Sequence, residues 1–154
     1  MTRSTGKFVI TGGSEQTVSE APGEVKLTRV AGTQRFEGGI AGLGTVEWVF
    51  CYRSDRSARF VGFWRIAGSI DGRSGSLVLE SAGDHDGRQS RGRWQIVAGS
   101  GTGELEGISG EGSFHAPGGP EASCELDYEI RLSSATSGAP GRADSARRRG
   151  FMSS

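Results

Sequence analysis

Apolar and polar residues alternate with a period of two along most of the chain. In the segment 124–132, CELDYEIRL, apolar residues hold every second position and charged residues hold the positions between them. The segment 45–52, TVEWVFCY, places Trp48, Phe50 and Tyr52 on one face. Such alternation is typical of strands with one buried face. No segment keeps a helical period, so the sequence predicts an all-β protein.

Eight strands are expected from this pattern. They cover residues 7–11, 24–36, 45–52, 58–70, 76–82, 91–97, 112–116 and 124–132. Turn-forming sequences separate several of them, including residues 54–57 (SDRS), Asp71-Gly72 and Asp86-Gly87, and Asp-Gly pairs tolerate the positive φ of tight hairpins. Short hairpins throughout predict an up-and-down meander, which eight strands can close into an antiparallel barrel. We expect one such domain over residues 1–132.

The composition changes after the last predicted strand. Residues 133–154, SSATSGAPGRADSARRRGFMSS, are dominated by Ser, Ala, Gly, Pro and Arg. This composition predicts a disordered tail, with the three consecutive arginines at 147–149 as a solvated charge run.

A glycine-rich segment, residues 98–114 (AGSGTGELEGISGEGSF), has two interpretations. A phosphate-binding Walker loop requires a lysine, and none is present here. A dinucleotide-binding loop requires a following helix, which Gly107 and Gly110 would interrupt. The segment is therefore predicted to be a barrel corner with at most a single helical turn around residues 104–107.

Charge and cysteine content exclude several partners. Lys plus Arg and Asp plus Glu number 18 each, so no global electrostatic attraction to nucleic acid or to acidic membranes is expected. Cys51 and Cys124 lie far apart and are expected to be reduced. With no Cys/His cluster, and with residues 84–86 (DHD) expected to face solvent, neither a metal nor another cofactor is predicted. The N-terminus has no apolar segment, which favours a cytoplasmic location and no membrane span.

Aromatic residues give the strongest indication of a ligand. Those on the apolar face of their strands are Trp48, Phe50, Tyr52, Phe60, Trp64, Trp94 and Tyr128. They either pack as an ordinary core or line a pocket for a small apolar molecule. Three charged residues within the same strands, Glu47, Arg65 and Glu80, either face solvent or lie in the barrel interior, where they would polarise a ligand.

Three segments also resemble a bacterial family of domains of unknown function. They are 52–62 (YRSDRSARFVG), 72–79 (GRSGSLVL) and 99–105 (GSGTGEL), and they are close, in order, to the family patterns Y-x-x-D-G-x-A-x-F-V-G, G-R-S-G-S-F-V-L and G-S-G-T-G-E-L. This family is similar to the allene oxide cyclase barrel, a relative in shape of lipocalins and dirigent proteins. The resemblance implies an eight-stranded antiparallel barrel and supplies no catalytic mechanism. The chain has Arg56 where the family often has Gly and Trp64 where it tends to have Glu, which would make the lumen more apolar.

Three functions are compatible with such a barrel. The leading expectation is a protein that binds a small apolar molecule, with cofactor-free cyclase or isomerase activity arising from orientation of that molecule in the lumen. In that case the tryptophans shape the substrate and Glu47, Arg65 or Glu80 polarises it. The second is a non-catalytic carrier or sensor. The third is a barrel with a side-chain-filled lumen that acts through its outer surface, with a homodimer as one form.

Overall fold

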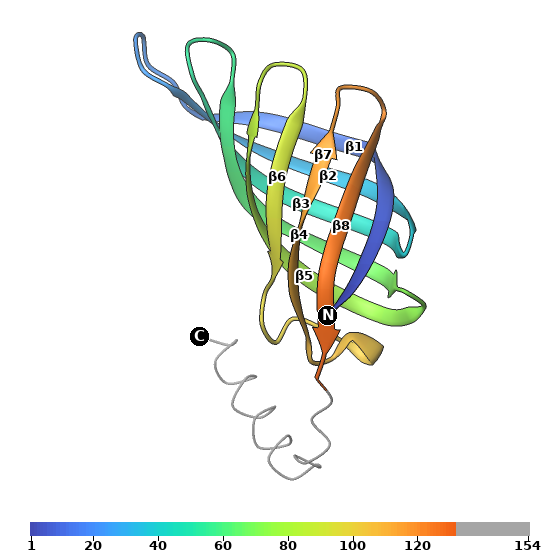
Figure 1. Cartoon of the computed structure of the whole chain (residues 1–154). Helices are drawn as coiled ribbons and strands as arrows, with labels where there is room; N and C mark the ends of the chain where they lie inside the picture. Colours follow the sequence, from blue (N-terminus) through green and yellow to red (C-terminus); the bar gives the residue numbers. More distant parts are fainter. Residues whose placement is uncertain (132–154) are drawn as a thin grey trace, which may run out of the picture.

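The computed structural model describes residues 1–131, so the tail predicted for residues 133–154 lies outside the described residues. The strands are β1 (Thr2–Ser19), β2 (Lys26–Gly38), β3 (Ile40–Tyr52), β4 (Ala58–Ile70), β5 (Arg73–His85), β6 (Ser90–Ile96), β7 (Ile108–Ala116) and β8 (Glu121–Ile130). Each pairs antiparallel with the next, and β8 pairs with β1 to close a barrel (Figure 1). The predicted all-β, up-and-down barrel is confirmed.

The strand boundaries differ most from the prediction in β1. The sequence predicts a strand over residues 7–11, whereas β1 is 18 residues long. Thr2 to Val9 pair with β8, pairing with β2 begins at Gly6, and the later part of the strand pairs with β2 alone after a register shift between Ile10 and Gly12. All residues from 11 to 20 are exposed, so this part has no buried face to produce an alternating pattern.

The glycine-rich segment forms a corner between β6 and β7, as predicted. A single 3-10 turn, η1 (Gly103–Leu105), lies within it, and Leu105 is 1% exposed at this end of the barrel. Two side chains fasten the corner to β5: Thr102 Oγ1 accepts the Ser76 N–H at 3.0 Å, and Ser100 Oγ accepts the Val78 N–H at 3.1 Å. The segment therefore closes one end of the barrel.

The β4–β5 hairpin lies at the same end. Its turn residues Asp71 and Gly72 have φ values of 48° and 85°, which is the conformation that two-residue hairpins require. The Asp71 carboxylate accepts hydrogen bonds from Ser4 Oγ at 2.8 Å and from the Tyr128 hydroxyl at 2.7 Å. This carboxylate thus ties the hairpin to β1 and β8 across the barrel closure.

Aromatic side chains fill the lumen. Trp64 is 1% exposed, and its ring lies 5.0–6.1 Å from those of five other residues: Phe8, Phe36, Trp48, Trp94 and Phe114. Glycines make room for two of the phenylalanine rings, because a Cβ at Gly83 or Gly92 would overlap the ring of Phe60 or Phe114. The interior is a packed core. In residues 1–131, no helix has the length and apolar character that crossing a membrane requires.

Candidate functional site

The structure places the aromatic residues that the sequence singles out on the inner face of the wall. The three tryptophans share one interior, with ring centroids 5.2 Å apart for Trp48 and Trp64 and 5.1 Å apart for Trp64 and Trp94. Phe60 stacks on Phe50 at 5.0 Å in the same cluster. Trp48 and Phe50 are partly buried at its margin, whereas the other three are buried.

The indole N–H groups find partners within the protein. Trp48 Nε1 and Trp64 Nε1 both donate to Ser81 Oγ, at 3.1 and 2.9 Å, and Trp94 Nε1 donates to the Glu125 carbonyl oxygen at 2.9 Å. Buried polar groups that are already paired gain little by exchanging that partner for a ligand. The tryptophans are thus arranged as a satisfied core.

The two tyrosines lie at opposite ends of the barrel. Tyr52 stacks on Phe50 at 5.8 Å, and its hydroxyl donates to Glu15 Oε2 at 2.6 Å, to which Thr28 Oγ1 also donates at 2.7 Å. Burial, together with this hydrogen bond, raises the pKa of Tyr52 to about 12, and the bond from Tyr52 lowers the pKa of Glu15. Burial is also the main reason that the pKa of Tyr128 is raised at the other end. Because Tyr52 and Tyr128 lie at opposite ends of the barrel, one small ligand would not contact both of them.

The predicted polar groups, Glu47, Arg65 and Glu80, are exposed on the outer face of the wall. Glu47 precedes Trp48 in β3, and consecutive side chains of a strand point to opposite faces. The strand wall therefore separates these charged groups from the indoles. The structure brings Glu47 and Glu80 near each other, one on either side of Phe63 in the strand register. Both line a hollow that Trp48 and Trp94 also border from within the wall.

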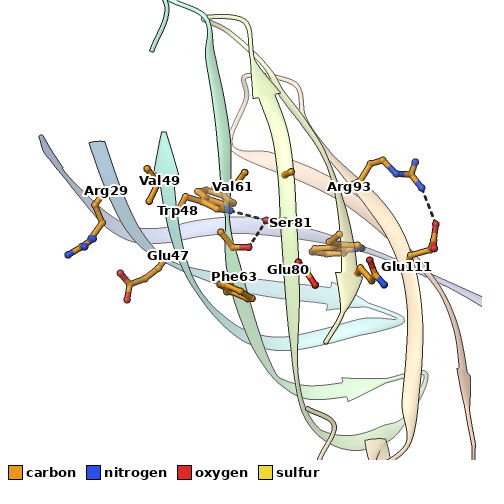
Figure 2. Close-up of a pocket in the computed structure, with 14 residues that line it drawn as sticks. Arg29, Glu47, Trp48, Val49, Val61, Phe63, Glu80, Ser81, Arg93 and Glu111 are labelled. Carbon is orange, nitrogen blue, oxygen red and sulfur yellow. Dashed lines mark hydrogen bonds and ion pairs between the residues drawn. The ribbon is translucent and has the colours of Figure 1, made fainter. Parts of the chain in front are cut away.

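A hollow lies on the outside of β3 to β6 (Figure 2). It has a volume of about 530 Å³ and includes Glu47 and Glu80 in its lining. Its most exposed apolar side chains are Val49, Val61 and Phe63, whose exposed fractions are 43%, 50% and 56%. Adjacent exposed apolar side chains with a polar rim are typical of binding surfaces.

Charges of both signs surround these apolar residues. Arg93 on β6 and Glu111 on β7 pair at 3.2 Å, as Figure 2 shows, and Arg29 lies at the opposite side of the hollow. Among the residues that the structure describes, Glu47 and Glu80 have no hydrogen bond or ion pair. Both carboxylates are exposed to solvent.

Metal-binding and thiol chemistry do not contribute to this hollow. Within residues 1–131, no three His, Cys, Asp or Glu side chains gather as a metal site requires. Cys51 and Cys124 are free thiols, the first half-buried and the second buried. Burial raises the pKa of Cys124 to about 12, so its thiolate is scarce at neutral pH.

The sequence interpretation missed the apolar residues of the outer hollow as a group. Val61 and Phe63 stand on the face of β4 opposite to Trp64, and Val49 stands on the same face of β3 as Glu47. Each looks unremarkable by itself, because single exposed apolar residues are common. The strand register reveals that these residues form a cluster: Val49 lies directly opposite Val61 on the neighbouring strand, and Phe63 lies beside this pair.

The fold and this site define an antiparallel eight-stranded barrel with a packed lumen and an exposed, partly apolar hollow on its outer wall. The chain belongs to the DUF3224 family, proteins of unknown function, whose family model matches residues 4–128. It is similar to the crystal structure of a DUF3224 protein with unknown function from Shewanella oneidensis MR-1, with 26% identity, a TM-score of 0.70, and coverage of 86% of this chain and 99% of that one. No curated protein matches the chain. The likeness to the allene oxide cyclase barrel stays a prediction.

Proposed function

We propose that this protein is a non-catalytic interaction barrel that binds its partner on the outer wall of β3 to β6. The observation that carries the proposal is the division between the two faces of that wall. The inner face consists of packed aromatic rings with paired indole N–H groups, and the outer face carries the adjacent exposed side chains Val49, Val61 and Phe63. A filled lumen leaves the outside as the surface available for recognition.

The same division argues against catalysis inside the lumen. Orientation-based catalysis needs an enclosed substrate and polar groups within hydrogen-bond reach of it. Glu47, Arg65 and Glu80 point away from the lumen into solvent. A substrate lying among the tryptophans would have the strand wall between it and these groups.

A second candidate function is suggested by the size of the outer hollow. Its volume of about 530 Å³ falls within the range of small-molecule sites, roughly 300–1,000 Å³. A small apolar molecule could lie on Val61 and Phe63 with a polar end near Glu47 or Glu80. This would be a carrier or sensor that binds its ligand outside the barrel.

The proposal can be tested with the apolar dye 8-anilinonaphthalene-1-sulfonate at low protein concentration. We expect the dye to bind the native protein. Phe63→Ser should weaken this binding, because it removes the exposed aromatic ring of the outer hollow. Trp64→Phe, a change on the adjacent inner-facing residue, is the matched control and should leave dye binding unchanged. Dye binding that is insensitive to Phe63→Ser but lost in Trp64→Phe would place the accessible apolar site in the lumen and overturn the proposal.

A further inference from the structure

The outer face of β3 to β6 has a charge pattern that can complement itself. The strand register arranges its side chains in two rows that run across the strands. The arginine row consists of Arg29, Val49, Val61, Ala82 and Arg93. The glutamate row lies two residues further along each strand, on the same face of the sheet. It consists of Glu47, Phe63, Glu80, Gln95 and Glu111.

From these rows we infer that the partner is a second copy of this chain, bound face to face about a two-fold axis that runs between the rows. This inference rests on the proposed function of the outer wall. A rotation of 180° about such an axis places the arginine row of one copy opposite the glutamate row of the other. The contact is therefore isologous, which is the usual form of a homodimer interface.

Apolar contacts lie at the centre of this arrangement. Val61 of each copy lies opposite Phe63 of the other, because the two residues stand on the same strand in different rows. Both side chains are at least half exposed in the single chain. Paired sheets pack about 10 Å apart, a gap that a valine and a phenylalanine side chain can fill together.

Opposite charges meet at the rim. Arg93 of one copy lies next to Glu80 and Glu111 of the other, which stand on the two neighbouring strands about 4.8 Å to either side. At the other end of the row, Arg29 lies next to Glu47 of the other copy. The carboxylates of Glu47 and Glu80, which have no partner among the described residues, thereby acquire one. The exposed Arg93–Glu111 pair within a chain is weak enough to be exchanged.

Two observations favour a second copy over a partner of different charge. The hollow carries both signs in alternating rows, whereas a surface that binds a strongly acidic or basic partner is dominated by one sign. The whole chain has a formal net charge of zero, so two copies approach without long-range repulsion. Burial of the three exposed apolar side chains then favours association.

Sedimentation equilibrium of the full chain tests the inference. We expect a reversible dimer, and we expect Phe63→Arg to raise its Kd by at least about tenfold, because the change buries a charge at the centre of the interface. Glu80→Arg and Arg93→Glu should each weaken the dimer. The double variant that carries both should recover part of the affinity, because the charges at positions 80 and 93 meet again across the axis while Glu111 of the other copy then faces a like charge. Glu129→Arg is the matched control: it makes the same change on the exposed face of β8, on the far side of the barrel, and should leave the Kd unchanged.

The outcomes separate this inference from the proposed function. A chain that is monomeric at all concentrations would overturn the second copy as partner, and dye binding lost in Phe63→Ser would still support the outer wall as the binding surface. A dimer that is unaffected by Phe63→Arg, or a double variant no tighter than its weaker parent, would also overturn the inference. Circular dichroism of each variant establishes that the barrel is folded, as the exposed positions lead us to expect.

Discussion

The replacement of Trp64 by alanine measures how much the filled lumen contributes to stability. The side chain is 1% exposed and contacts five other aromatic rings. Substitutions of this type cost about 3–5 kcal/mol through lost burial and the cavity that remains. The lost hydrogen bond adds no large penalty, because Ser81 Oγ still accepts the Trp48 indole N–H. We therefore expect a loss of about 4 kcal/mol, a large part of the roughly 5–15 kcal/mol typical of a domain.

Urea unfolding followed by circular dichroism, at a concentration where the chain is monomeric, provides the measurement. Trp64→Phe should cost less than Trp64→Ala, because a phenyl ring keeps most of the contacts. Phe63→Ala is the matched control on the next residue of β4; its side chain is 56% exposed, and the expected cost is below about 1 kcal/mol. A loss below about 1 kcal/mol for Trp64→Ala would refute the reasoning and indicate a loosely packed lumen.

Three further predictions follow from the packing and the titration behaviour. Gly62→Ala should destabilise the barrel markedly, since its Cβ would overlap the Glu47 carbonyl oxygen and the Trp48 ring, whereas Gly119→Ala, which meets open space, should be close to neutral in urea unfolding. The pKa of Tyr52, raised to about 12 from an ordinary 10, means that its contribution to stability is complete below pH 10 and is lost as the pH rises toward 12. Tyrosinate absorbance should show this delayed titration in the native state, and Tyr52→Phe should remove the part of it with a midpoint near 12, which leaves only the titration of Tyr128, whose pKa is also raised; a midpoint near 10 for both tyrosines would contradict this. In the native protein the half-buried Cys51 should react with a thiol reagent well before Cys124, whose pKa is raised to about 12, and equal rates would contradict this.

The alternation of side chains was enough to predict the strands, but it left open which of the two faces lines the lumen. In β4, Phe60, Trp64 and Ile66 share one parity and Val61 and Phe63 the other, and the structure buries the first set. The strand prediction succeeds because a barrel wall has one buried and one solvent-exposed face, so that apolar and polar residues alternate with a period of two in the sequence. The strand prediction fails where both faces are exposed to solvent, as in the part of β1 from residue 11 to residue 19.

The candidate site could not be predicted to the same degree. Alternation alone states that Glu47 and Trp48 lie on opposite faces, but it does not show whether the lumen is filled or open. That depends on how rings from β3, β4, β6 and β7 meet across the barrel, which is a property of tertiary packing. The outer cluster depends on the cross-strand register of Val49 and Val61, which is equally invisible in a single strand.

The central claim, that the lumen is a structural core and the outer wall is the binding surface, is tested most directly by the indole N–H resonances of Trp64 and Trp94. Trp64 Nε1–H donates a hydrogen bond to Ser81 Oγ, and Trp94 Nε1–H donates one to the Glu125 carbonyl oxygen. During titration with a panel of fatty acids and aromatic polyketides, the account predicts that both indole signals stay unshifted and exchange slowly with solvent, while any shifts fall on the amides of Val49, Val61 and Phe63. A saturable shift of the Trp64 and Trp94 indole signals, with the outer amides unmoved, would show that the lumen opens to a ligand and would contradict the account.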